Sequence, residues 1–112
     1  MRFVLMAQAE EGDGGEPAVR ERAALDRYEQ DLVRAGVLLA AEALEPAATG
    51  ARIHFDGEDR SIDHSPGPSA ARATGLWMLQ TAGEDEALEW ARRLPLTSGS
   101  VEVRRVAGDV GR

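Results

Sequence analysis

Apolar and polar positions recur along the chain with two different periods. Residues 2–8, RFVLMAQ, form a short apolar run rich in strand-forming side chains. Residues 17–35 have helical spacing instead, and Gly36 suits the left-handed cap that ends such a helix. The apolar positions of this predicted helix are Val19, Leu25, Tyr28 and Leu32. Residues 37–43, VLLAAEA, are expected to form a buried strand.

The middle of the chain predicts a β-hairpin, because ARIHF and RSID flank the turn residues DGED. A four-residue loop would set Ile53 opposite Ile62. The same register would set Arg52 opposite Asp63. A two-residue loop would place Arg60 opposite Ile53, which is a poorer match, so the pairing favours the longer loop.

The last third of the chain predicts a strand, a helix and a second strand. Residues 74–81, TGLWMLQT, form an apolar run, and residues 100–106, SVEVRRV, alternate in the way of a half-buried strand. Between them, acidic residues open a helix that Pro95 ends. The expected apolar stripe of this helix is Ala87, Leu88, Ala91 and Leu94.

The predicted order is β-α-β, a hairpin, and β-α-β, which is the α+β, ferredoxin-like pattern with an antiparallel sheet. The length of 112 residues fits a single domain over 1–112. Within it, residues 9–16 are rich in glycine and acid, and we expect a mobile loop there that folding does not require.

Three of the predicted strands are apolar on both faces, although two helices can cover only one face of a four-stranded sheet. A second copy is the economical cover, and two sheets packed face to face would make a dimeric α/β barrel. We therefore expect a homodimer, with either Trp77 and Leu79 or Leu76 and Met78 in the seam. The alternative is that the hairpin and the proline-rich loop 64–72 fold over the open face.

Composition narrows the chemistry. The chain has no cysteine and no lysine, which excludes disulfides, thiolate sites and a Schiff-base lysine. The net charge of −7 argues against nucleic-acid binding. The apolar stretches are too short for a membrane span or a signal peptide, so we expect a cytoplasmic protein. No glycine loop matches a phosphate-binding motif, and the sequence predicts neither a cofactor nor a metal.

Several segments together resemble the YCII-related proteins, in particular the branch named for a DGPF motif. They are LVRAGVL (32–38), EALEP (42–46), GLWML (75–79), DEALEWA (85–91) and SVEVR (100–104). The resemblance implies a ferredoxin-like, dimeric α/β barrel. It secures no activity for the DGPF branch, whose members are often encoded beside extracytoplasmic-function sigma factors.

The sequence departs from the family pattern in two places. Asp63 fits the first letter of the DGPF motif, but His64-Ser65-Pro66 follow it. Other YCII-related proteins resemble enzymes with a His–Asp pair on the first helix and before a proline after the second helix. Here the first helix has no histidine and Leu94 precedes Pro95, so that pair does not carry over.

The best candidate site lies on the hairpin, where Arg52, His54 and Asp63 share one face. A carboxylate beside a histidine fixes the imidazole tautomer and supports acid–base catalysis, and Arg52 could hold an anionic substrate group. The alternative is a solvated face with a weak Arg52–Asp63 ion pair. Weaker candidates are a Ser65 nucleophile beside His64, and a metal site. The metal set would be Asp56, Asp59, Asp63 and His64.

Two functional hypotheses follow. One is a small-molecule enzyme or ligand-binding protein that uses acid–base chemistry. The other is a non-catalytic accessory or regulatory protein associated with an extracytoplasmic-function sigma factor. An enclosed pocket lined by His54 and Asp63 would favour the first, and a filled barrel with an exposed apolar patch would favour the second.

Overall fold

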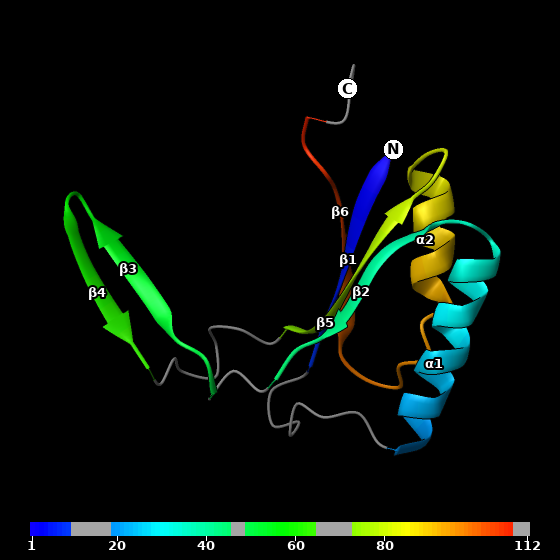
Figure 1. The fold of residues 1–112 in the computed structure, drawn as a ribbon, viewed down its shortest axis with the longest axis horizontal. Helices are drawn as coiled ribbons and strands as arrows, with labels where there is room; N and C mark the ends of the chain where they lie inside the picture. Colours follow the sequence, from blue (N-terminus) through cyan, green and yellow to red (C-terminus); the bar gives the residue numbers. More distant parts are fainter. Residues whose placement is uncertain (10–18, 46–48, 65–72, 109–112) are drawn as a thin grey trace.

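A computed structural model describes residues 1–9, 19–45, 49–64 and 73–108 (Figure 1). The predicted order of elements is confirmed. The elements are β1 (Arg2–Gln8), α1 (Val19–Arg34), β2 (Leu38–Ala43), β3 (Arg52–Asp56), β4 (Asp59–Asp63), β5 (Ala73–Gln80), α2 (Glu84–Arg92) and β6 (Ser100–Arg105). The loop predicted over 9–16 lies outside the described residues apart from Ala9.

Four strands form one antiparallel sheet in the order β2-β5-β1-β6, and β3 and β4 form a separate two-stranded sheet. The central strand β1 pairs with β5 on one side and with β6 on the other. Two β-α-β halves therefore interleave their strands, as the ferredoxin-like pattern requires. The chain is an α+β protein with two described helices.

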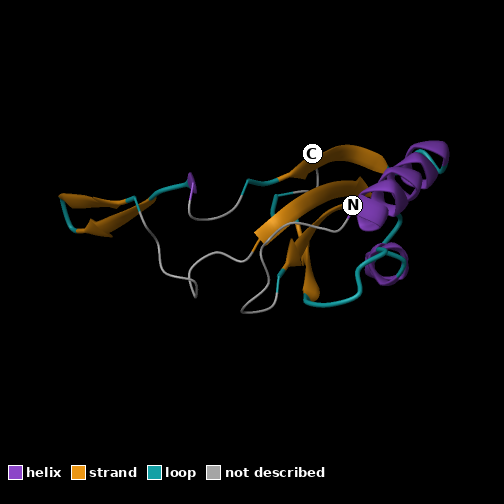
Figure 2. Ribbon diagram, turned by 90° about the horizontal axis from the view of Figure 1, so that it is seen from below, coloured by secondary structure: helices purple, strands orange, loops and turns teal. Residues whose placement is uncertain are grey.

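Both helices cover the same face of the sheet (Figures 1 and 2). Side chains alternate across a strand, so only every second residue of β1 and β5 points toward the helices. Most of these residues are buried, whereas their neighbours in sequence are partly buried or, at Gln80, exposed. The main buried set is Phe3, Leu5, Ala7, Tyr28, Leu32, Val37, Trp77, Leu79, Ala87, Trp90, Ala91 and Leu94.

The single tyrosine links the two helices to the sheet. The Tyr28 hydroxyl of α1 donates a 2.7 Å hydrogen bond to the backbone carbonyl of Trp90 in α2. Its ring meets the Trp77 and Trp90 rings edge-on, with centroid distances of 6.4 and 6.2 Å. Edge-on packing of this kind adds to the stabilisation from apolar burial alone.

The structure corrects two expectations about the core and decides between the two seam pairs that the sequence left open. Leu88 is exposed, and Trp90 takes its place on the buried side of α2. Trp77 and Leu79 lie beneath the helices, so Leu76 and Met78 are the pair on the open face.

The second corrected expectation concerns strand β2, which is less apolar on its open side than predicted. Its register against β5 shifts between Leu38 and Ala40, and Leu39 within the shift is half-exposed. Leu38 and Ala41 pack against the core. The β2 residue that faces Leu76 across the ladder is Glu42, which is charged.

The hairpin has the predicted register, with Ile53 opposite Ile62 and Arg52 opposite Asp63. Pairing continues to Asp56 and Asp59, so the turn is tighter than the four-residue loop that we expected. Gly57 enters this turn at φ 61, a backbone angle that suits glycine. Figures 1 and 2 place the hairpin on the side of the sheet away from the helices and clear of the strands.

No described helix is long and apolar enough to cross a membrane.

We predict that Gly99→Ala destabilises the fold much more than Gly36→Ala. Both glycines have positive φ, which costs an alanine about 1–2 kcal/mol. Only at Gly99 would a Cβ also overlap the backbone carbonyl of Gln8, adding roughly 1–3 kcal/mol. Urea unfolding of both variants measures the difference, and equal losses would contradict the prediction.

We predict that Tyr28 dominates the fall in stability with pH between about pH 9.5 and 11. Burial raises the pKa of the Tyr28 hydroxyl above its ordinary value, Arg93 opposes this, and Glu29 adds to it. The folded state therefore keeps a proton that the unfolded chain releases, so stability falls as pH rises above about 10. The chain has no lysine or cysteine and no other tyrosine, so other side chains contribute little to this fall.

Tyr28→Phe tests this point. It should cost about 1 kcal/mol at neutral pH, because the hydrogen bond to Trp90 is lost. It should also remove most of the decline in unfolding free energy between about pH 9.5 and 11. Chemical denaturation at several pH values measures both effects, and parallel profiles for the two proteins would refute the prediction.

Candidate functional site

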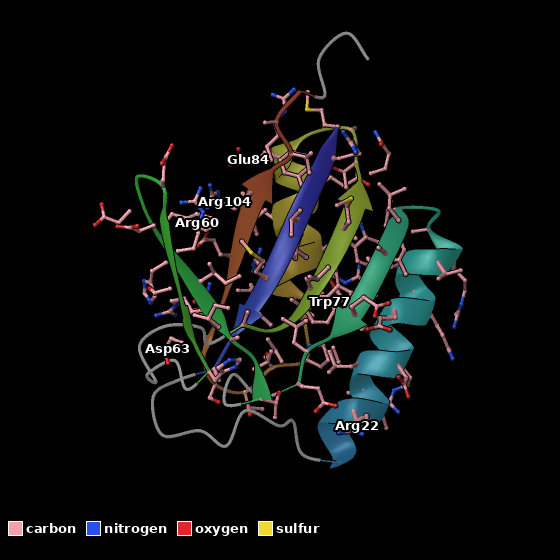
Figure 3. The ribbon with its side chains drawn as sticks, turned by 60° about the vertical axis from the view of Figure 1, so that its left-hand side comes forward. Arg22, Arg60, Asp63, Trp77, Glu84 and Arg104 are labelled. Carbon is pink, nitrogen blue, oxygen red and sulfur yellow. The ribbon has the colours of Figure 1, made fainter. Side chains whose placement is uncertain are left out.

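One face of the hairpin carries the residues expected to do chemistry. Arg52 faces Asp63 across the two strands, and His54 faces Ser61. Alternation puts all four on the same face, with His54 diagonal to Asp63. His54 is exposed, whereas Arg52 and Asp63 are partly buried (Asp63 is labelled in Figure 3).

The other face of the hairpin is apolar. It carries Ile53, Phe55 and Ile62, all of them exposed. Phe55 pairs with Arg60 across the strands, and the Arg60 guanidinium lies 4.6 Å from the centroid of the Phe55 ring. The hairpin is therefore amphipathic, with an ionic face and an uncovered apolar face.

The uncovered face of the main sheet is a second candidate surface. Its centre is formed by Val4 and Met6 of β1 with their cross-strand partners Met78 and Leu76 of β5. These side chains are partly buried. On the neighbouring strand β6, Arg104 and Glu102 form a 3.0 Å ion pair that borders this centre (Figure 3).

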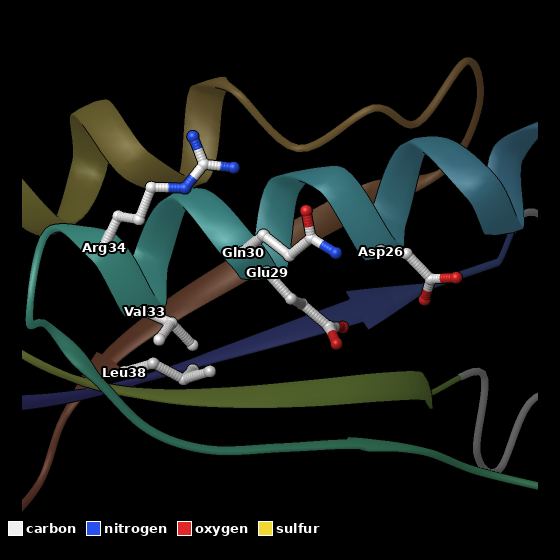
Figure 4. A pocket seen from close by; sticks show the side chains of 6 residues that line it. All are labelled: Asp26, Glu29, Gln30, Val33, Arg34 and Leu38. Atoms are coloured by element: carbon white, nitrogen blue, oxygen red, sulfur yellow. The ribbon is translucent and has the colours of Figure 1, made fainter.

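A groove of about 490 Å³ runs between α1 and β2 (Figure 4). It is lined by Asp26, Glu29, Gln30, Val33, Arg34 and Leu38. The Trp77 indole N–H donates a 2.8 Å hydrogen bond to the Glu29 carboxylate, which fixes one acceptor beside the groove. This bond joins residues 48 positions apart, so no local pattern in the sequence signals it.

The sequence-predicted site residues gather only on the hairpin. His54 is not among the residues that line the groove between α1 and β2. A site at His54 would therefore need another surface to exclude water, because water weakens electrostatic interactions.

The structure gives no support to the two weaker candidates, which are the metal site and the Ser65 nucleophile. Within the described residues, no three His, Asp or Glu side chains are placed to hold a metal ion. The set Asp56, Asp59, Asp63 and His64 is thus not gathered into a metal site. Ser65, considered as a nucleophile, lies outside the described residues.

Comparisons with known proteins place this fold. No curated protein matches the sequence significantly. A similar solved structure is that of 5-chloro-2-hydroxyhydroquinone dehydrochlorinase from Burkholderia phenoliruptrix AC1100 in complex with 2,5-dihydroxybenzoquinone. It is 14% identical, has a TM-score of 0.58, and the match covers 95% of this chain and 93% of the other. The model of the YCII-related domain matches residues 1–108, and the chain therefore belongs to the YCII-related domain family.

Proposed function

We propose that this protein is a homodimeric small-molecule enzyme or ligand-binding protein. Its family and its similarity in fold to a dehydrochlorinase that binds a dihydroxybenzoquinone support a small organic ligand. The chemistry of the chain is compatible with such a ligand, because an apolar surface bordered by a few charged groups is typical of small-molecule sites.

The observation that carries the proposal is the uncovered apolar centre of the sheet. Met6 and Leu76 form one of its cross-strand pairs, and Val4 and Met78 form the other. A second copy laid on this face, about 10 Å away as in packed sheets, would complete a barrel. The interior would then be apolar, with the Glu102–Arg104 pair at its border.

The catalytic groups in this proposal are those of the ionic hairpin face. His54 exchanges a proton with the substrate, Asp63 orients the imidazole, and Arg52 holds an anionic substrate group. The register supports this assignment, because Arg52 lies opposite Asp63 and His54 lies one pair further along. An imidazole is suited to this role because its charge changes near neutral pH.

Three more specific assignments stay predictions: membership of the DGPF branch, the dimeric barrel and a cytoplasmic location. Neither the family nor the similar structure supports the regulatory alternative, in which the protein accompanies a sigma factor, although the exposed apolar hairpin face is the kind of surface that the alternative requires.

We predict a dimer in sedimentation experiments at micromolar concentration. Met6→Asp should give a monomer or an unfolded chain, because it would bury an unpaired charge in the seam. Leu88→Asp is the matched control, since Leu88 is exposed on α2 and should leave the dimer intact. A wild-type protein that stays monomeric would overturn the dimer.

We predict that His54→Ala lowers kcat/KM by about 10²–10⁴-fold while leaving the unfolding free energy nearly unchanged. The small stability effect follows from the exposure of His54. Leu88→Ala, which changes an exposed residue of α2 and not of the hairpin, is the control and should retain activity.

The probes are 2,5-dihydroxybenzoquinone for calorimetric binding and chlorinated hydroxyhydroquinones for turnover, chosen from the similar structure. Binding or turnover of these compounds supports the small-molecule function. If none binds or reacts, this ligand class is wrong. If turnover occurs and His54→Ala matches the wild type, the assignment of His54 is wrong while the small-molecule function stands.

A further inference from the structure

The apolar hairpin face is unusual for a surface that meets only water. Ile53 is 50% exposed, Phe55 69% and Ile62 60%. The register places all three side chains on one side of the two strands, so they form one patch. A patch of large apolar side chains on an otherwise charged hairpin indicates a surface that something covers.

The protein's own sheet does not cover this patch. Figures 1 and 2 both place the hairpin beyond the open sheet face and apart from it. The hairpin thus projects on the side of the sheet where a second copy would lie if it packed on Val4, Met6, Leu76 and Met78. A partner on that face would meet the hairpin as well as the sheet.

The area needed for a stable dimer supports the same occupant. Four strands about 4.8 Å apart, each with about six residues at 3.3 Å, give a flat face of about 400 Å². A standard interface buries about 800 Å² on each partner. That figure is accessible surface, which exceeds the flat outline of a face, so the sheet gives at most a standard interface and a contact with the hairpin would enlarge it. The hairpin patch is an exposed apolar cluster placed to supply that contact.

The single charge on the apolar hairpin face also suits such a contact. Arg60 lies near the tip, beside Phe55. On the open sheet face, Glu42 of β2 and Glu102 of β6 flank the apolar centre on its two sides. Glu102 is already paired with Arg104, so a guanidinium that crosses to the second copy would find the Glu42 carboxylate at the β2 border.

We propose that the β3–β4 hairpin is an arm that clasps a second copy of the chain through Ile53, Phe55 and Ile62. The inference rests on the proposed dimer and adds a contact that enlarges its interface. Strand alternation then directs His54 and Asp63 away from the clasped surface. The arm thus contributes to assembly with its apolar face, and the ionic face takes no part in the clasped contact.

The test is the dimer dissociation constant of hairpin variants, measured by sedimentation over a dilution series. Phe55→Ser and Ile62→Ser should each raise the constant at least about tenfold, because a symmetric interface loses each side chain twice. Leu88→Ser, which removes an exposed apolar side chain from α2, is the matched control and should leave the constant unchanged.

The unfolding free energy of each variant is measured at protein concentrations below the dimer dissociation constant, where the chain is monomeric. Because Phe55 and Ile62 are exposed in the single chain, neither substitution should lower it appreciably. Loss of monomer stability would mean that the hairpin packs on its own sheet, and would overturn the arm. A wild-type dimer with unchanged constants in both variants would overturn the arm alone, whereas a monomeric wild type would overturn both the arm and the proposed dimer.

Discussion

Two helices can shield only one face of a four-stranded sheet, and this constraint organises the molecule. The helix layer buries every second residue of β1 and β5, from Phe3 and Leu5 to Trp77 and Leu79. The alternate residues in the middle of the same strands, Met6 among them, are apolar but lack that cover. The charged strand β6 limits the apolar area to the middle of the sheet, where Glu102 and Arg104 form a border.

Local patterns were sufficient to predict the elements and the hairpin register. Ile53 and Ile62 are the apolar residues of their strands that match in size, and their pairing fixed the remaining partners. The patterns failed where packing chose between neighbours. Trp90 buries more apolar area than Leu88 and takes the inner side of α2. The register shift in β2 depends on its alignment with β5, which its own sequence does not encode.

The candidate site, like the fold, could be predicted only where it depends on a short stretch of sequence. Arg52, His54 and Asp63 could be assigned to one face because a hairpin is local, and its register follows from a short stretch of sequence. The bond from Trp77 to Glu29 could not be predicted, because it depends on how α1 lies across the sheet. Whether water is excluded from His54 depends on surfaces distant in sequence or on another chain, so no spacing within this sequence determines it.

The clustering of the aromatic residues has a consequence for spectroscopy. Tyr28 lies within 6.4 Å of both tryptophan rings, so its excitation energy passes to them and the emission of the protein comes from indole. Both indoles sit where the helices meet the sheet, and the hairpin sequence contains neither tryptophan nor tyrosine. Intrinsic fluorescence therefore reports the integrity of the helix–sheet layer and is silent about the hairpin.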